Sequence, residues 1–431
     1  MNREARRRQR KAGGTGGVGS EYPTLLQPGG AVRAGHSTAT NPQSILWYSN
    51  APWAATGYGE QTAQILPRLV ASGHKLAVLA NYGLEGAATD WNGIHVYPRG
   101  MAPYSDDVLQ AHAAHWADQN PTMPHCVITL FDAWVLEAKA LAKIDRIYSW
   151  VPIDHKPAPP KVVAWCKQPN VKPIAMSKFG QEMLEIEGVE SFYAPHGIEA
   201  AYKPTEKIVA LNGESMTGRQ MARINNDAFV VMMNSANKGA VPSRKAFGEN
   251  LLAFSLFAQD KPDAVLYMHT EIAGSMGGID LPKLAAACGI RDGQIVFVDQ
   301  YAYRASLPKE VLAAFYTQAD VLLACSMGEG FGIPVVEAQA CGTRVIVSNF
   351  TAQPELCGDG WIVTGQPWWD PMQHAWFFTP SVTEIVAALE AAYVAPRGAS
   401  QKAIDFAAQY EANRVYEDYW VPIMEQIGAE S

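Results

Sequence analysis

The sequence predicts an α/β protein built from two doubly wound parallel sheets, each covered by helices. From residue 45 onward, short apolar segments alternate with stretches of helical periodicity, which is typical of parallel strands joined by helices. This series occurs twice, on either side of a polar segment of low periodicity at residues 206–226. A chain of 431 residues is long enough for two such domains, each with its own core.

The individual elements follow from short buried runs and from helical spacing. In the first series, strands are predicted at residues 45–49, 75–80, 125–130, 146–151 and 173–176, and helices at 60–72, 135–142 and 178–187. In the second series, strands are predicted at 228–233, 264–269, 294–298, 320–324 and 344–347, and helices at 245–258, 281–287, 309–318 and 334–340. The stretch 399–427 is mostly helical and ends with one apolar stripe.

Four parts are expected along the chain: a tail at residues 1–40, a first domain at 41–204, a second domain at 205–410 and a C-terminal helix at 411–431. The tail is basic and rich in glycine, a composition that favours disorder. Two interpretations of it stay open. One is a solvated segment without a partner, and the other is peripheral contact with an anionic surface such as a membrane.

Composition excludes several classes of function. The net charge of −8 argues against a general nucleic-acid partner. The six cysteines are scattered without a Cys-x-x-Cys pair, which favours reduced thiols in a cytoplasmic protein. No apolar run approaches the length of a membrane span, and the basic N-terminus lacks the apolar stretch of a secretory signal.

The most informative segment is residues 325–342, which reads as a Gly-rich loop between a buried strand and a helix opened by Pro334. Such an arrangement aims backbone N–H groups and the positive helix end at an anion. Glu329 lies in the loop and Glu337 about one turn into the helix, where both can accept hydrogen bonds from hydroxyls. An anion cradle flanked by two hydroxyl acceptors describes a site for a sugar nucleotide. A purely structural turn is disfavoured, because the loop, the proline and both glutamates occur together.

This segment resembles the Glu-x7-Glu motif of the retaining family-4 glycosyltransferases, which have the GT-B fold. The resemblance implies two Rossmann-like domains that face each other across a cleft, with the acceptor on the first and the nucleotide sugar on the second. It also implies that the C-terminal helix crosses back to the first domain, although packing on its own domain stays open. Glu329 would contact the transferred sugar and Glu337 the ribose hydroxyls. The amides that would contact sugar and diphosphate are those of Gly330, Phe331, Gly332 and Ile333.

Basic residues follow the first strand of the second series. A departing diphosphate needs positive charge in a site poor in water. The resemblance implies an Arg and a Lys here, and Lys245 matches best. Ser235 stands near the place of the usual Arg, so Arg244 or Lys238 is expected to replace it. Asn234 is assigned to the donor site as well.

Gly57 and Gly59 follow the first strand of the chain and match a family loop that approaches the donor diphosphate. The alternative is a tight turn into the next helix. The pattern is not a dinucleotide fingerprint, because Thr62 occupies the place of its third glycine.

Polar and aromatic residues at the ends of predicted strands in the first domain are candidates for acceptor binding, because ligands bind at that edge of open α/β sheets. Asp154 aligns with a family position that contacts the sugar or acceptor, and we assign it to the catalytic group. Its carboxylate and that of Asp132 orient an acceptor hydroxyl or simply cap helices, and both interpretations stay open. The other candidates for the acceptor site are Trp53, Trp134 and His155.

The predicted function is transfer of a hexose from a nucleoside diphosphate sugar to a hydroxyl acceptor with retention of configuration. Glu329, Lys245, Arg244 and Asp154 form the predicted catalytic group. No cofactor or metal is expected, since no Asp-x-Asp pair lies at a likely strand end of the first domain. The acceptor class is open among glycan, lipid, protein and small molecule. The alternatives are a sugar-nucleotide epimerase or phosphorylase, or a non-catalytic carbohydrate-binding protein on the same fold.

Overall fold

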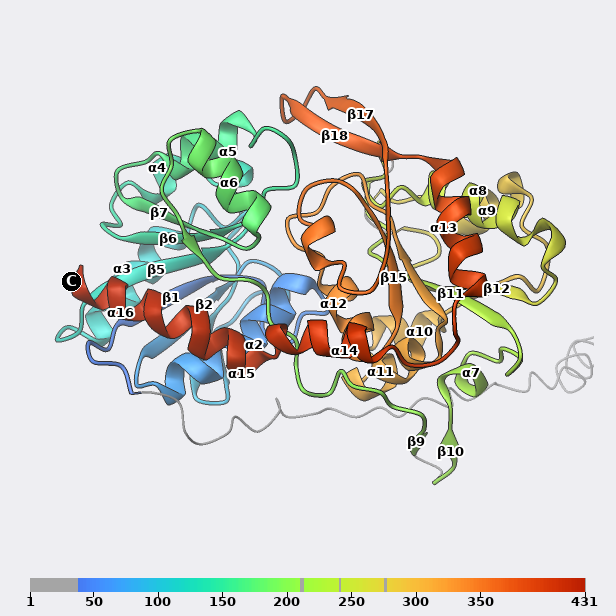
Figure 1. Cartoon of the computed structure of the whole chain (residues 1–431). Coiled ribbons are helices and arrows are strands. Elements are labelled where there is room, and N and C mark those ends of the chain that lie inside the picture. The colour runs from blue at the N-terminus through green and yellow to red at the C-terminus, as the bar shows by residue number, and fades with distance from the viewer. Residues whose placement is uncertain (1–37, 210–212, 240–241, 275–276, 431) are drawn as a thin grey trace, which may run out of the picture.

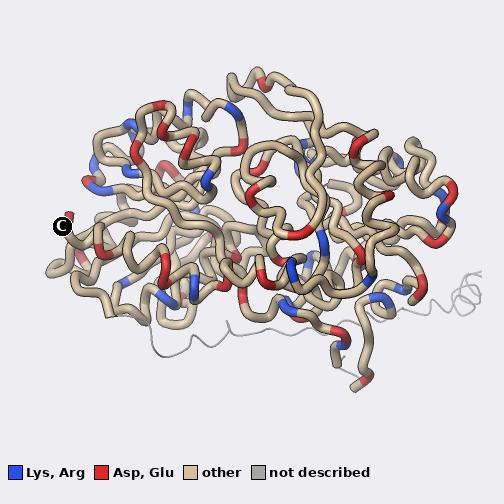
Figure 2. The backbone as a smooth tube through the Cα atoms, viewed as in Figure 1, with Lys and Arg blue, Asp and Glu red and all other residues tan. Residues whose placement is uncertain are grey.

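The computed structural model describes residues 38–209, 213–239, 242–274 and 277–430. Over this part of the chain, two parallel sheets each carry helices on their faces, as the alternating pattern predicts (Figure 1). The basic cluster and the Gly-rich run of the predicted tail lie outside the described residues. Acidic and basic residues are interspersed over both domains (Figure 2). In the described part, no helix is long and apolar enough to span a membrane.

The first sheet has eight strands in the order β3-β4-β2-β1-β5-β6-β7-β8, and every pair is parallel except β3 with β4. Its strands are β1 (Ser44–Ser49), β2 (Lys75–Ala80), β3 (Thr89–Trp91), β4 (Ile94–Tyr97), β5 (His125–Leu130), β6 (Ile147–Val151), β7 (Val171–Ala175) and β8 (Phe192–Tyr193). Its helices are α2 (Gly57–Ala71), α3 (Leu109–Gln119), α4 (Ala138–Leu141), α5 (Pro160–Cys166) and α6 (Lys178–Ile186). The central strand β1 is buried along its whole length, which explains why residues 45–48 form a continuous apolar run.

The second sheet has six parallel strands in the order β13-β12-β11-β14-β15-β16. Its strands are β11 (Phe229–Asn234), β12 (Ala264–His269), β13 (Ile295–Phe297), β14 (Val321–Ala324), β15 (Arg344–Ser348) and β16 (Gly360–Val363). Its helices are α8 (Phe247–Phe257), α9 (Leu281–Cys288), α10 (Gln300–Arg304), α11 (Lys309–Gln318), α12 (Ile333–Ala340) and α13 (Val382–Val394). The polar segment between the sheets contains a short hairpin of β9 (Ile208–Val209) and β10 (Ser215–Met216), followed by α7 (Gly218–Met221).

Three predicted boundaries near the site are wrong. The helix expected at 245–258 begins at Phe247, because Ala246 has φ 48° and interrupts a helical start at Lys245. The helix expected at 60–72 begins at Gly57, where the Thr56 side chain caps the first turn. The helix expected at 135–142 is a 3-10 turn, η1 (Ala133–Val135), followed by the short α4.

A hairpin that the sequence analysis did not predict follows β16. Its strands are β17 (Gly365–Asp370) and β18 (Ala375–Pro380), and they pair with each other rather than with either large sheet. Lys156 of the first domain exchanges two backbone hydrogen bonds with Trp376 of β18, each 3.0 Å long. The hairpin therefore connects the second domain to the first (Figure 1).

After α14 (Gln401–Ala407), the chain returns to the first sheet through α15 (Ala412–Val415) and α16 (Val421–Ala429), as Figure 1 shows. Trp420 is fully buried there, with ring centroids 4.9 Å from Trp150 and 5.8 Å from Trp47. At the junction of the domains, this returning segment lies beside the connection that leads from the first domain to the second. Ile198 donates its N–H to the carbonyl of Tyr410 over 2.8 Å and accepts from Ala412 over 2.9 Å.

Candidate active site

The Gly-rich loop between β14 and α12 lies directly against the end of β6 in the first domain. A Cβ at Gly328 would lie 2.1 Å from the carbonyl oxygen of Asp154, and one at Gly330 would lie 2.3 Å from the Cβ of Pro152. Glycine at these two positions therefore permits a backbone contact between the domains that no other residue would allow. Gly332 has φ 123°, which glycine adopts without strain, and caps α12.

Two cations hold the carboxylate of Glu329. Arg244 donates from Nη1 to Oε2 over 2.9 Å and to the carbonyl of Gly328 over 2.6 Å. Lys245 donates from Nζ to Oε1 over 2.5 Å. Burial alone would raise the pKa of Glu329, but Lys245 and Arg244 outweigh burial and lower it to about 2. The loop carboxylate is thus ionised at neutral pH and held next to both cations.

Asp154 brings the first domain to the same cluster. Its Oδ2 lies 3.8 Å from Nη1 of Arg244, and its Oδ1 lies 2.7 Å from Nδ1 of His155. The other ring nitrogen of His155 lies 3.2 Å from Oδ2 of Asp370 on the β17–β18 hairpin. Burial opposes ionisation of Asp154, yet His155 and Arg244 lower its pKa. The cluster therefore joins carboxylates and cations from both domains.

Asp132 lies beside this cluster and is bonded to α2. Tyr58 donates its hydroxyl to Oδ1 of Asp132 over 3.2 Å. Burial and the nearby charge of Asp154 raise the pKa of Asp132, although Arg244 opposes them. The two aspartates differ as a result: Asp154 is stabilised as a carboxylate, whereas Asp132 is the better proton acceptor.

Glu337 lies in a separate environment, buried behind the loop on α12. Tyr316 donates its hydroxyl to Oε2 over 2.9 Å, and Tyr202 from the connection between the domains forms a second hydrogen bond to the same carboxyl group. Burial raises the pKa of Glu337 to about 7, despite these two bonds. Close by, Lys309 and Glu60 form an ion pair of 2.7 Å between the two domains.

The remaining donor-site candidates have different positions. Asn234 donates to the hydroxyl of Tyr316 over 2.6 Å and therefore lies next to Glu337. Lys238 is exposed and takes no part in the ion pairs of the described residues. Gly57 faces α12, since a Cβ there would lie 3.5 Å from Cδ1 of Ile333. Gly59 packs against the turn before α2, where a Cβ would lie 2.2 Å from the carbonyl of Ala54.

The aromatic and loop candidates also differ in exposure. Phe331 is buried, with its ring centroid 5.1 Å from that of His196 at the domain junction. His155 is buried and stacks on Phe377 of the hairpin. Trp53 is exposed on a loop of the first domain, and Trp134 is exposed in the 3-10 turn η1. The arrangement thus combines a partly buried charged centre with exposed aromatic rings on the first domain.

Several residues of the site were missed by the sequence analysis. Tyr58, Tyr202, Tyr316 and Asp370 reach the predicted residues only through the fold. The signal for Asp370 was weak but present, because it lies in an aromatic-rich run at residues 365–380. Tyr58 lies between the two glycines that the analysis singled out.

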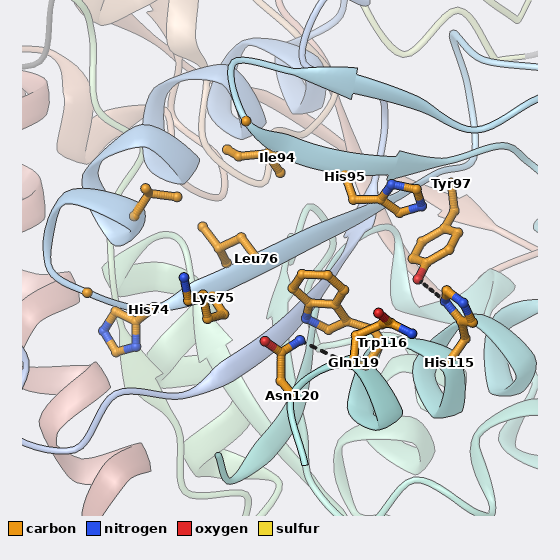
Figure 3. A pocket seen from close by; sticks show the side chains of 13 residues that line it. His74, Lys75, Leu76, Ile94, His95, Tyr97, His115, Trp116, Gln119 and Asn120 are labelled. Carbon is orange, nitrogen blue, oxygen red and sulfur yellow. Dashed lines mark hydrogen bonds between the residues drawn. The ribbon is translucent and has the colours of Figure 1, made fainter. Parts of the chain in front are cut away.

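A pocket of about 540 Å³ lies elsewhere on the first domain, between β2, β4 and the end of α3 (Figure 3). His74, Lys75 and His95 line it close to the beginnings of their strands. The candidate active site is at the opposite, carboxyl edge of the sheet. Tyr97 and His115 form a hydrogen bond of 2.5 Å in this pocket, away from the charged cluster.

Comparison with known proteins supports the class that this geometry suggests. A model of the family described as "Glycosyl transferases group 1" matches residues 238–404. O-antigen chain mannosyltransferase B from Escherichia coli is 39% identical over 75 residues, which are 17% of this chain and 18% of that protein. D-inositol 3-phosphate glycosyltransferase from Streptomyces avermitilis is 29% identical over 146 residues, which are 32% of this chain and 29% of that protein. The chain thus spans less than a third of the length of these relatives.

Solved structures extend the likeness to nearly the whole chain. Sucrose-phosphate synthase from Thermosynechococcus elongatus superposes with a TM-score of 0.67 at 16% identity, over 90% of this chain and 100% of the other. Anabaena HepE in complex with UDP-glucose superposes with a TM-score of 0.58 at 17% identity, over 90% and 98%. The chain has the GT-B fold, which confirms the predicted fold class.

Proposed function

We propose that this protein is a retaining glycosyltransferase of the family-4 type, which moves a hexose from a nucleoside diphosphate sugar to a hydroxyl acceptor. The observation that carries the proposal is the pairing of Glu329 with Arg244 and Lys245 at the start of α12. It brings together two cations, a Gly-rich loop and the ionised carboxylate of Glu329, which can accept hydrogen bonds from sugar hydroxyls. A diphosphate and the sugar attached to it need this combination.

The roles follow from the charges. Arg244 and Lys245 bind the donor diphosphate and stabilise the negative charge that develops as it departs. Glu329, released from these cations by the diphosphate, accepts hydrogen bonds from the transferred sugar. When the donor binds, Glu337 gives up its hydrogen bonds with Tyr316 and Tyr202 and accepts hydrogen bonds from the ribose hydroxyls instead. Asp154 and Asp132 orient the acceptor hydroxyl from the opposite domain.

In this proposal the acceptor attacks the face from which the diphosphate leaves, and the diphosphate takes the acceptor proton. The anomeric configuration is therefore retained. No divalent metal is required, because the two cations and the start of α12 supply the positive charge. The six cysteines are free, in keeping with a cytoplasmic location.

Two measurements test the proposal. Thermal unfolding with uridine, guanosine and adenosine diphosphates and their sugars should show stabilisation by at least one donor, because a ligand that binds the folded state raises its stability. NMR of the product should then show the anomeric configuration of the donor. An inverted product would contradict the mechanism, and activity that EDTA abolishes and Mn²⁺ restores would contradict metal independence.

A further inference from the structure

Exposed aromatic rings follow four neighbouring strands of the first sheet. Tyr104 comes after β4, Tyr82 after β2, Trp53 after β1 and Trp134 after β5, and these strands are consecutive in the sheet. Their exposed fractions are 37, 54, 42 and 43%, respectively. Because parallel strands end at one edge, the loops that carry these rings leave the sheet side by side, over about 15 Å at the usual strand spacing. We call these four residues the aromatic row.

The aromatic row leads to the candidate active site. The next strand after β5 is β6, which is followed by Asp154 and its contact with Arg244. Trp134 comes two residues after Asp132 and therefore stands next to the charged cluster. The row is thus continuous with the place where the acceptor hydroxyl must lie.

Contacts between the loops fix the aromatic row in place. Trp53 donates from its ring to the carbonyl of Gly83 over 2.8 Å, and Ala51 donates its N–H to the carbonyl of Tyr82 over 2.8 Å. The hydroxyl of Tyr48 donates to the carbonyl of Tyr104. Trp53 is thus held through its ring, and the loops of Tyr82 and Tyr104 are held through their backbones, which reduces the entropy lost on binding.

The charge of the loops selects the kind of ligand. Residues 50–56, 81–88, 98–108 and 131–137 contain five carboxylates and one cation, which are Glu85, Asp106, Asp107, Asp132, Glu137 and Arg99. Arg99 is itself paired with Glu85 at 3.4 Å. Anionic membranes and phosphorylated ligands bind to clusters of basic residues, so an excess of carboxylates disfavours both. Carboxylates do accept hydrogen bonds from sugar hydroxyls.

We infer that the acceptor is an uncharged oligosaccharide that lies along the aromatic row, with its sugar rings against Tyr104, Tyr82, Trp53 and Trp134. This inference rests on the proposed glycosyltransferase function and adds the class of acceptor. Aromatic rings pack against the apolar faces of sugars while their polar ends stay hydrated. The end of the oligosaccharide nearest Trp134 presents its hydroxyl to Asp154 and the donor.

Calorimetry on the full chain tests this inference with linear gluco- and manno-oligosaccharides of one to six units. Affinity should rise with length over the first units and then level off. Tyr82→Ala and Tyr104→Ala should each lower affinity for the hexamer by about two- to tenfold, as expected for one aromatic contact. Tyr301→Ala, which removes an exposed ring from α10 in the second domain, should change nothing.

Other outcomes would overturn the inference. These are affinity that does not depend on length, equal or tighter binding of oligogalacturonate, and tyrosine-dependent binding to phosphatidylglycerol vesicles. The thermal midpoint of each variant shows whether it is folded, and Tyr82→Phe, which keeps the ring, should keep the hexamer affinity. Failure of the proposed function is seen separately. In that case nucleotide sugars fail to stabilise the protein, whatever the result with oligosaccharides.

Discussion

Glu329 is paired with two cations, Arg244 and Lys245, and in the proposed mechanism the donor diphosphate would take its place. Lys245 is bonded to Glu329 and lies near Arg244. Burial, and next to it the positive charge of Arg244, lowers the pKa of Lys245. A diphosphate carries enough negative charge to replace Glu329 as the partner of both cations. In the proposed mechanism, binding of the donor would therefore free the carboxylate of Glu329 to contact the sugar.

Loss of Lys245 should consequently slow the reaction. Lys245→Ala is expected to lower turnover at saturating donor by about 10²–10³, because one preorganised charge partner of the leaving group is removed. Lys283→Ala provides the control, since that lysine is exposed on α9 and pairs only locally with Asp280 among the described ion pairs. A fall of less than about tenfold would assign the diphosphate to another cation, such as Lys238.

Glu337 gives stability a dependence on pH. Its folded pKa of about 7 lies above the ordinary value of 4.5, so between these values the folded state binds more protons than the unfolded state. Stability contributed by protonated Glu337 is therefore fully present below pH 4.5 and is lost as pH rises through 7. For this buried group the loss is on the order of 3 kcal/mol.

Glu337→Gln should remove that dependence. The variant keeps the shape and the hydrogen bonds of a neutral carboxyl group, so its unfolding free energy should fall less than that of the natural chain between pH 5 and 8. Urea unfolding at several pH values measures the difference. Parallel curves for both proteins would show that Glu337 does not titrate in this range.

At the level of elements, the β17–β18 hairpin supports the charged centre from the second domain. Asp370 is buried, accepts the N–H of Met372 over 2.8 Å and contacts His155, which in turn contacts Asp154. The hairpin therefore helps to set the position of Asp154. His155 also stacks on Phe377 of β18, so two residues of the hairpin orient the same ring.

Asp370→Asn should destabilise the protein by about 1–3 kcal/mol, because the substitution replaces the carboxylate that contacts His155 with an uncharged amide. Asp418→Asn provides a matched control, since Asp418 forms an exposed pair with Arg414 that is worth at most about 1 kcal/mol. Chemical denaturation of both variants measures the difference. Equal stabilities would show that the hairpin is held by its backbone and aromatic contacts alone.

Local patterns explain which elements were predictable. The loop, the proline and the two glutamates of residues 325–342 belong to one strand–loop–helix unit, so their arrangement follows from nearby residues. The start of α8 was misjudged because Ala246 adopts a positive φ that no local signal marks in an alanine. Tyr202 and Asp370 could not be placed at the site, because they reach it from distant segments through tertiary packing.

At the scale of the whole molecule, one apolar core continues from the first sheet into the second domain. It includes Trp47, Trp150 and Trp420 together with Phe331 and Tyr316. The C-terminal segment is part of this core rather than a peripheral helix. The stability of the first sheet should therefore depend on this segment, which packs Trp420 against Trp47 and Trp150.

Trp420→Ala should lower the free energy of unfolding by about 3–5 kcal/mol, as expected for a large buried aromatic residue. Tyr301→Ala provides the control, because that ring is 66% exposed on α10 and its loss should change stability by about 0.5 kcal/mol or less. Hydrogen exchange should show faster exchange in α15, α16 and β1 of the Trp420 variant. Unchanged protection in β1 would mean that the segment is not coupled to the sheet.

The two chain crossings at the domain junction also limit how the domains can move. A single connecting strand would let one domain swivel freely about its backbone bonds. Here Ile198 is hydrogen-bonded on both sides to residues of the returning chain, so the crossings form a narrow ribbon. A two-stranded ribbon resists twisting but bends across its flat face. The domains should therefore separate by a hinge motion rather than by rotation about the connection. We expect such a joint to let Gly328 and Gly330 re-form the same contacts with Asp154 and Pro152 after the domains separate.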